Sequence, residues 1–256
     1  MNVVAMIPAR YASVRFPGKS LALIRGPDGV KRTLVEHTWR AACEVSGISG
    51  VYILTDDLRI AKVAQSIGAD FIMTSNSCRN GTERCAEALA RLGADPDIVV
   101  NLQGDAPLTP PWFIEDLTKA LSEAEDYLVA TPIIACDPVA RERLLNDRRN
   151  GRVGGTTAVF GRNKQALYFS KEVLPYGGSP TFHHVGVYAY RPDALARYQE
   201  WPEGWLEKSE GLEQLRFLEN GVPMLCVETD AKGRDFWEIN NPEDIEIVEK
   251  IYAGLK

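Results

Sequence analysis

The chain has 256 residues, of which 45% are hydrophobic and 25% are charged. Its 29 Lys and Arg against 35 Asp and Glu give a net charge of −6, which argues against a general nucleic-acid-binding protein, because such proteins carry a basic excess. Aromatic and β-branched residues occur throughout and argue against disorder, and a chain of this length can bury a core without disulfides or a structural metal.

The first half predicts a regular alternation of strands and helices. Short apolar runs predict buried strands at residues 3–7, 50–55, 70–73 and 97–102. Apolar residues at helical spacing predict helices at 33–46, 58–67, 82–92 and 111–124, the first of them with Thr33 and Glu36 in a capping box. This order is typical of βαβ units, so we expect an α/β, Rossmann-like fold of three layers with a mostly parallel central sheet.

The second half has a different pattern and predicts a small antiparallel excursion within a single domain. The predicted strands lie at 127–134, 156–160, 166–170, 184–190 and 223–228, and the predicted helices at 206–220 and 242–254. Residues 141–155 are charged and Gly-rich and predict a surface loop, and residues 175–180 predict a second, turn-rich loop.

The cysteines and the N-terminus indicate a cellular location. The five cysteines are odd in number and include no CxxC pair, so reduced thiols are expected and neither a disulfide framework nor a zinc site is indicated. The first residues lack a signal-peptide pattern, and the sequence has no run of about 18 apolar residues. We therefore expect a cytoplasmic protein that does not span a membrane.

The loop after the first strand concentrates positive charge. Arg10, Arg15 and Lys19 lie among small residues and a Pro17-Gly18 pair. Glycine lets the backbone approach a ligand, and Arg and Lys neutralise phosphate oxygens, so the loop is typical of a triphosphate site. Neither the GxxxxGK[ST] spacing nor the GxGxxG spacing occurs, and a solvated basic loop is the alternative.

A series of motifs in fixed order resembles one enzyme family over nearly the whole chain. The motifs are IPARYASVRFPGKSLA (7–22), TDD (55–57), GTER (81–84), NLQGDAPL (101–108), ALYFSK (166–171), HVGVYAYR (184–191), LEQLRFLENG (212–221) and NPEDIE (241–246). Together they resemble the CMP-Kdo synthetase family, the 3-deoxy-manno-octulosonate (Kdo) cytidylyltransferases of lipopolysaccharide biosynthesis. The resemblance implies a nucleotide-diphospho-sugar transferase-like fold, with residues 1–125 as the nucleotide-binding half and residues 126–256 as the acceptor-binding and dimerisation half.

The resemblance also implies a reaction and a set of site residues. The hydroxyl of a sugar acid would attack the α-phosphate of CTP and release pyrophosphate, with Mg²⁺ as the cofactor. The implied catalytic residues are Arg10, Lys19 and Asp105. The implied nucleotide-binding residues are Ala9, Arg10, Ser13, Arg15, Lys19, Thr82, Arg84 and Gln103. The implied acceptor-binding residues are His184, Tyr188, Glu213 and Gln214. The implied metal ligands are Asp105 and Asn240.

Several of these residues have a plain structural alternative. A Gly-Asp pair is common in turns, so Asp105 gains its metal role from the QGDxP context after a strand. Gln103 can stabilise its own loop, and a lone histidine at a strand edge, such as His184, is often structural. Glu213 and Gln214 can belong to an exposed helix face.

The sequence departs from the family pattern mainly on the acceptor side. Asn240 stands where the family has the Asp that is its second metal carboxylate, so Asn240 ligates, Asp235 or Glu238 substitutes for it, or the second metal ligand is lost. Ala106 replaces a carboxylate. The family's Lys is Thr157, its loop Arg is missing from residues 175–178, and its basic residue before the motif histidine is His183. We therefore expect the CTP half to be preserved and the acceptor to be changed, to an altered 2-keto-3-deoxy sugar acid, an amino-sugar acid or another small hydroxyl compound.

Two other functions stay open at this point. The first is a nucleotidyltransferase that uses another NTP or another acceptor, such as a sugar phosphate. The second is a degenerate, non-catalytic nucleotide-binding protein. Ala106 and Asn240 favour it, and the intact Arg10, Arg15, Lys19 and Asp105 disfavour it. A homodimer is expected from the resemblance alone.

Overall fold

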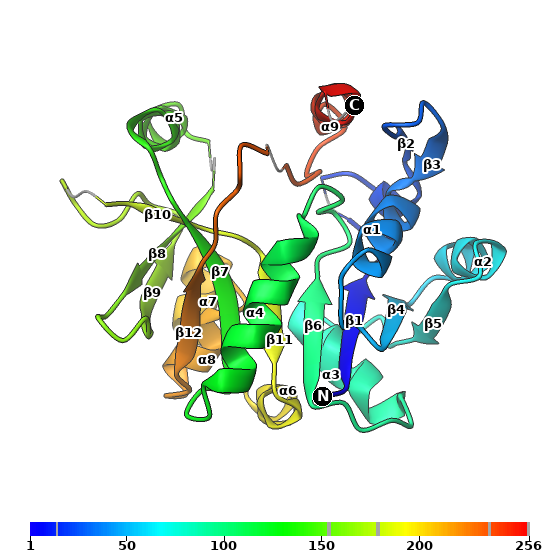
Figure 1. Cartoon of the computed structure of the whole chain (residues 1–256), viewed down its shortest axis with the longest axis horizontal. Helices are drawn as coiled ribbons and strands as arrows, with labels where there is room; N and C mark the ends of the chain where they lie inside the picture. Colours follow the sequence, from blue (N-terminus) through cyan, green and yellow to red (C-terminus); the bar gives the residue numbers. More distant parts are fainter. Residues whose placement is uncertain (14, 153–154, 178–179, 235–236, 255–256) are drawn as a thin grey trace. The chain divides into compact units, whose positions relative to one another are not determined.

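Two compact units make up the chain. The computed structural model describes residues 1–13, 15–152, 155–177, 180–234 and 237–254 (Figure 1). The first unit contains residues 1–115 together with residues 231–256, and the second contains residues 116–230. The C-terminal residues therefore belong with the N-terminal unit, a placement that a linear division at residue 125 does not include.

A four-stranded parallel sheet forms the centre of the first unit (Figure 1). Its strands, in spatial order, are β5 (Asp70–Met73), β4 (Gly50–Thr55), β1 (Val3–Pro8) and β6 (Ile98–Leu102). Its connecting helices are α1 (Leu34–Cys43), α2 (Leu58–Ser66) and α3 (Gly81–Arg91). Every strand pair among these four is parallel, so their carboxyl ends share one edge, and the predicted α/β fold with a parallel central sheet is confirmed.

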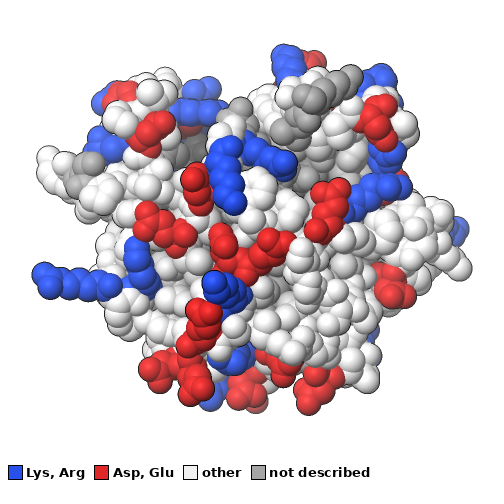
Figure 2. Space-filling view, viewed as in Figure 1, with Lys and Arg blue, Asp and Glu red and all other residues white. Residues whose placement is uncertain are grey.

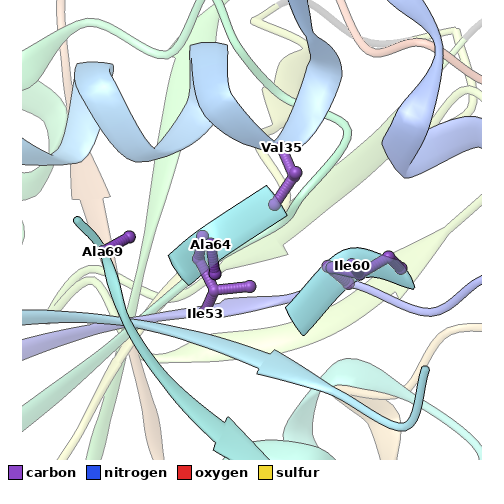
Figure 3. Close-up of a cluster of buried hydrophobic side chains, with 6 residues drawn as sticks. Val35, Ile53, Ile60, Ala64 and Ala69 are labelled. Carbon is purple, nitrogen blue, oxygen red and sulfur yellow. The ribbon is translucent and has the colours of Figure 1, made fainter. Parts of the chain in front are cut away.

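The helix boundaries follow from local capping, and the apolar face of each helix packs on the sheet. The hydroxyl of Thr33 accepts a hydrogen bond from the Glu36 amide at 3.4 Å, as the capping box predicts. One core cluster joins α1, α2 and β4 through Val35, Ile53 and Ile60, with Ala64 beside them (Figure 3). This cluster holds β4 and its helices in place, so the polar residues after each strand begin from a rigid edge.

The C-terminal segment packs against a small hairpin of the first unit. The elements concerned are η1 (Lys19–Leu21), β2 (Leu23–Arg25), β3 (Lys31–Thr33) and α9 (Asp244–Gly254). A second core cluster joins them through the buried side chains of Ile24, Leu34, Leu108, Ile239, Val248 and Tyr252. This apolar contact brings residues 237–244 beside the loop that follows β6.

The second unit is a mixed sheet with helices. Its strands are β7 (Val129–Ala135), β8 (Thr156–Phe160), β9 (Ala166–Ser170), β10 (Phe182–His184), β11 (Val187–Tyr190) and β12 (Met224–Glu228). Its helices are α5 (Pro138–Arg149), α6 (Pro192–Glu200), α7 (Trp205–Glu210) and α8 (Leu215–Glu219), and α4 (Pro111–Glu123) begins in the first unit and ends in the second. β7 runs antiparallel to β10 and β11 and parallel to β12, while β8 is antiparallel to β9 and β10, which confirms the predicted antiparallel excursion.

The single strand predicted for residues 184–190 is wrong, because the structure has two strands there. The pairing register on β7 shifts by two residues between β10 and β11. The hydroxyl of Thr131 donates to the carbonyls of Val185 and Val187, at 3.4 and 2.9 Å, and therefore satisfies the backbone where the strand is interrupted.

Two other predictions for the second unit are also wrong. The helix predicted for residues 206–220 is two helices, because Gly211 adopts a left-handed φ of 62° and ends α7. The loop predicted for residues 141–155 is largely α5, which Pro138 begins and whose N-terminus is capped by the Asp137 carboxylate, accepting from the Ala140 amide at 2.7 Å. Helix α6 and the β2–β3 hairpin were not predicted.

Two further observations concern surface charge and helix length. Basic and acidic side chains are interspersed over the face shown in Figure 2, without a continuous basic stripe on that face. Among the residues that the structure describes, no helix is long and apolar enough to cross a membrane.

Candidate active site

The loop after β1 places Lys19 near the carboxyl edge of the parallel sheet. Gly18 has a φ of 73°, and a Cβ at this position would lie 3.1 Å from the ring of Tyr11. Glycine therefore lets the chain turn tightly here, and η1 begins at Lys19. The Lys19 ammonium is mostly buried, with 14% of its side chain exposed.

The loop after β6 meets the end of β1. A Cβ at Gly104 would lie only 2.4 Å from the carbonyl oxygen of Pro8, so only glycine allows this close approach. The next residue, Asp105, accepts a hydrogen bond and ion pair from the Lys19 ammonium, with 2.5 Å between Nζ and Oδ2. Two residues singled out as catalytic by the resemblance are therefore in direct contact.

The C-terminal segment completes this group of polar side chains. The Ile239 amide donates to the carbonyl of Asp105 at 2.9 Å, and the buried Ile239 side chain anchors the segment in the core. The Oδ1 atom of Asn240 accepts a hydrogen bond from Nη2 of Arg15 at 2.7 Å. The sequence places Arg15 and Asn240 225 positions apart, and the fold joins them.

Glu238 lies among the same groups. Burial, and next the charge of Asp105, raise the pKa of Glu238 to about 7, against the opposing effects of Lys19, a hydrogen bond from Asn240, and Arg15. Two carboxylates and two cations therefore share this edge of the first unit.

This donor set fits a magnesium ion. Mg²⁺ usually takes one or two protein carboxylates and completes its shell with phosphate oxygens and water. Asp105 and Glu238 offer such oxygens, and the Lys19 ammonium already occupies a cation position against Asp105. Among the described residues no group of three or more His, Cys, Asp and Glu side chains converges, so an all-protein metal cage is not what this site offers.

The remaining nucleotide-binding candidates of the first unit lie in the two loops that follow β1 and β6. The Ala9 amide donates to the Leu54 carbonyl at 2.8 Å and joins the ends of β1 and β4, and Arg10, next in the chain, is exposed. The Ser13 amide donates to the Tyr11 carbonyl and shapes the loop. The Gln103 amide lies against Gly81, the first residue of α3, so the loop after β6 and the start of α3 are neighbours.

The side chains of Arg84 and Thr82 are buried. Arg84 is 2% exposed, and its guanidinium donates to Thr74 and to the Ser75 carbonyl and lies 3.5 Å from the Asp56 carboxylate. These contacts tie the ends of β4 and β5 to α3. These contacts give Arg84 a structural role at this edge of the sheet, and its implied part in nucleotide binding stays a prediction.

Three of the four acceptor candidates meet in the second unit. The Tyr188 hydroxyl donates to Oε1 of Gln214 at 3.1 Å, and the rings of Tyr188 and His184 lie 5.6 Å apart. The Nε2 atom of His184 lies 2.8 Å from the Thr131 hydroxyl. Gln214 is buried, and its Nε2 atom has no hydrogen-bond partner among the described residues. Glu213 directly precedes Gln214 in the chain and is partly exposed.

The residues that replace the family's cations are uncharged neighbours. Thr157 on β8 pairs in register with His183 on β10. Burial lowers the pKa of His183 to about 4, so this imidazole is neutral near pH 7. Asp235 and part of the loop at 175–180 lie outside the described residues.

Some site residues were missed or left open in the sequence analysis. Asn101 is fully buried on β6, and neither polar atom of its amide has a partner within the described part of the chain. The amides of Asn101 and Gln103 both lie near Gly81. A polar residue inside the apolar run of a buried strand was the signal that could have found Asn101. The electrostatic effect of Asp105 on Glu238 depends on the folded chain, and no local pattern encodes it.

Comparisons with known proteins place these observations in context. A family model described as cytidylyltransferase matches residues 4–232. The 3-deoxy-manno-octulosonate cytidylyltransferase of Maricaulis maris is 45% identical over 99% of this chain and 98% of that protein. The 8-amino-3,8-dideoxy-manno-octulosonate cytidylyltransferase of Shewanella pealeana is 39% identical over 97% of this chain and 98% of that protein.

The likeness extends to solved structures. The structure of a CMP:2-keto-3-deoxy-manno-octonic acid synthetase complexed with CTP aligns with a TM-score of 0.86 and 31% identity, over 100% of both chains. The predicted resemblance and the predicted transferase fold are thereby confirmed over the whole length.

Proposed function

Because the chain belongs to the cytidylyltransferase family, a CTP-dependent group of enzymes, we propose that it transfers CMP from CTP to the hydroxyl of a 3-deoxy-octulosonate sugar acid. A new bond forms between the sugar oxygen and the α-phosphorus, and the bond between the α- and β-phosphates breaks. The hydroxyl proton is lost, and pyrophosphate leaves with the electron pair of the broken bond. The products are a CMP-activated sugar acid and pyrophosphate.

The observation that carries this proposal is the contact between Lys19 and Asp105. It lies at the carboxyl edge of a parallel sheet, where α/β folds bind their ligands. A cation and a carboxylate in this position suit a triphosphate, since the cation can move to phosphate oxygens and the carboxylate can hold their metal. This arrangement supports nucleotide binding in the first unit.

The reaction depends on positioning and charge neutralisation. Arg10, Arg15 and Lys19 would bind the triphosphate and stabilise the negative charge that grows on the leaving pyrophosphate. Gln103 and the start of α3 at Thr82 would face the nucleoside, with Arg84 holding that region from beneath. When bound, Mg²⁺ supplies positive charge beside the phosphate oxygens, and Asp105 is its proposed ligand, with Asn240 or Glu238 as the second.

The acceptor is proposed to bind through the second unit. His184, Tyr188, Glu213 and Gln214 offer hydrogen-bonding groups for the hydroxyls and the carboxylate of a sugar acid. Relatives named for Kdo and for its 8-amino derivative both match this chain over almost its full length, so these two acids are the candidate acceptors. The neutral pair of Thr157 and His183 supports the amino-sugar acid, because an ammonium group is repelled where a family member carries a cation.

A pyrophosphate-release assay tests the proposal. The full chain is mixed with CTP, Mg²⁺ and either Kdo or 8-amino-3,8-dideoxy-manno-octulosonate, and both products are quantified. Turnover of either acid supports the activity, and robust turnover of Kdo contradicts a changed acceptor. Failure of both acids, together with a larger thermal shift from UTP, GTP or ATP than from CTP, would overturn the assignment.

We also expect the enzyme to be a cytoplasmic homodimer. Free cysteines at all five positions support a reducing compartment, and the dimer follows from family resemblance. Sedimentation velocity on the purified chain tests the dimer, because a single monomeric species of 28.3 kDa would contradict it.

A further inference from the structure

The proposed reaction leaves the second magnesium ligand open between Asn240 and Glu238. Glu238 is partly buried and lies within reach of Asp105, Lys19, Asn240 and Arg15, each of which acts on its carboxyl group. The adjoining Ile239 is fixed on both sides, since its amide bonds to the Asp105 carbonyl and its side chain is buried. The hydrogen bond between the Ile239 amide and the Asp105 carbonyl therefore keeps the neighbouring residue Glu238 close to Asp105.

Asn240 makes two contacts that fix its amide in one orientation. Its Oδ1 accepts from the Arg15 guanidinium at 2.7 Å, and its side chain donates a hydrogen bond to Glu238. The oxygen that could ligate a metal is thus engaged by Arg15, and the amide nitrogen is directed toward Glu238. Asn240 connects a cation to a carboxylate instead of presenting a ligand.

Entry of CTP would change the local balance of charge. Lys19 now lies against Asp105, and a triphosphate of about four negative charges would draw its ammonium to the phosphate oxygens. Arg15 has further N–H groups for phosphate, so it can keep its hydrogen bond to Asn240. Asp105 and Glu238 would then face phosphate oxygens without the nearby ammonium of Lys19. A hard divalent cation relieves that repulsion, and it commonly binds one or two carboxylates together with phosphate oxygens.

We propose that Glu238, and not Asn240, joins Asp105 as the second carboxylate that holds Mg²⁺ when CTP is bound. Asn240 is then a positioning residue that aligns Glu238 and Arg15. This inference rests on the proposed function, because it assumes that CTP enters at the Lys19–Asp105 contact.

Metal affinity, measured without an acceptor, tests the proposal separately from turnover. Mn²⁺ replaces Mg²⁺ at oxygen ligands, and free Mn²⁺ is counted from its electron paramagnetic resonance signal during titration of the full chain with saturating CTP. Glu238→Gln keeps the size of the side chain and removes its charge, and we expect it to weaken Mn²⁺ binding by about 10- to 100-fold. Glu243→Gln is the matched control, because Glu243 is exposed in the same segment, and its affinity should equal that of the wild type.

A double variant provides the rescue. Glu238→Gln with Asn240→Asp moves the carboxylate two positions along the same segment, and it should recover Mn²⁺ affinity to within about threefold of the wild type if a second carboxylate is what the metal needs. Recovery also shows that the Glu238→Gln background still folds and binds CTP.

The outcomes separate the two proposals. An unchanged Mn²⁺ affinity in Glu238→Gln, with CTP-dependent binding intact in the wild type, overturns the role of Glu238 and leaves the proposed function standing. The absence of CTP-dependent Mn²⁺ binding in the wild type overturns the proposed function itself. A third outcome is that Glu238→Gln loses Mn²⁺ affinity and that adding Asn240→Asp does not restore it, although both variants unfold thermally like the wild type in the absence of metal. This outcome shows that a carboxylate at position 240 cannot replace the one at position 238, and it contradicts the proposal.

Discussion

The ammonium of Lys19 lies 2.5 Å from a carboxylate oxygen of Asp105, although 86 positions separate the two residues. The contact exists because two loops, one after β1 and one after β6, leave the same edge of a parallel sheet. Gly104 lets those loops touch, and η1 directs Lys19 between them. The site of the first unit is thus a product of strand order.

Replacing Asp105 should abolish activity and keep the fold. We expect Asp105→Ala to lower the rate of pyrophosphate release by at least about 10²-fold, because it removes the carboxylate proposed to hold the metal. The side chain is 23% exposed and its ion pair with Lys19 is partly open to solvent, so the free energy of unfolding should change by no more than about 1 kcal/mol. Asp95→Asn, at an exposed site in the same unit, is the control, and a wild-type rate in Asp105→Ala would contradict the mechanism.

The buried ion pair beside α8 should govern the stability of the second unit. Arg216 is fully buried, and its Nε and Nη2 atoms donate to the Glu207 carboxylate at 2.6 and 2.7 Å. Glu207→Ala leaves that charge without its partner, so the free energy of unfolding should fall by about 3–5 kcal/mol in urea titrations.

Lys208→Ala is the control for that measurement. Its ammonium is exposed and lies 3.8 Å from Glu203, so its loss should cost less than about 1 kcal/mol. Equal effects of the two substitutions would show that the buried pair contributes no more than a surface pair.

Acid should destabilise the second unit through its histidines. Burial, and then the charge of His183, lower the pKa of His184 to about 3, against 6.5 in an unfolded chain. Between these values the unfolded state binds a proton that the folded state does not, so stability is lost as pH falls below about 6.5. At pH 5 the loss is about 2 kcal/mol for His184. Denaturation at pH 7.5 and 5.0 should show it, and His184→Gln should give a shallower dependence; an identical dependence would refute the assignment.

Tyr188 should affect the acceptor and not the nucleotide. Its hydroxyl donates to buried Gln214, and Tyr188→Phe leaves that amide short of a partner in the proposed acceptor site. We expect KM for the sugar acid to rise about tenfold while KM for CTP stays unchanged. Tyr127→Phe, whose hydroxyl donates to the Asn163 carbonyl near the surface, serves as the control. A matching rise in KM for CTP would contradict the separation of the two sites.

The first unit was predictable because its signals are local. Buried parallel strands are continuous apolar runs, and each helix carries its own cap, as Thr33 does for α1. The second unit was harder because tertiary contacts override local pattern. Residues 184–190 resemble one strand, yet Thr131 stabilises a break in it, and residues 206–220 have continuous helical spacing, yet Gly211 ends the first helix.

The candidate site shows the same division. Lys19 and Asp105 follow strands and were predicted as partners in one site, and the structure brings them into contact. Arg84 has a charge typical of ligand binding, yet its guanidinium is buried against Thr74, Ser75 and Asp56, which lie 9 to 28 positions away in the sequence. The degree of burial distinguishes a charged side chain that faces the site from one that packs inside the protein. Burial is a property of the folded chain and cannot be seen in the local sequence.

The return of residues 231–256 to the first unit has a consequence for biosynthesis. The hydrogen bond between the Ile239 amide and the Asp105 carbonyl forms only after synthesis has passed position 239. A nascent chain can therefore assemble the parallel strands of the first unit, which end at Leu102, well before it gains Glu238 and the Asn240 partner of Arg15. Premature termination between positions 103 and 237 would yield a product that retains these four strands and lacks this edge of the site.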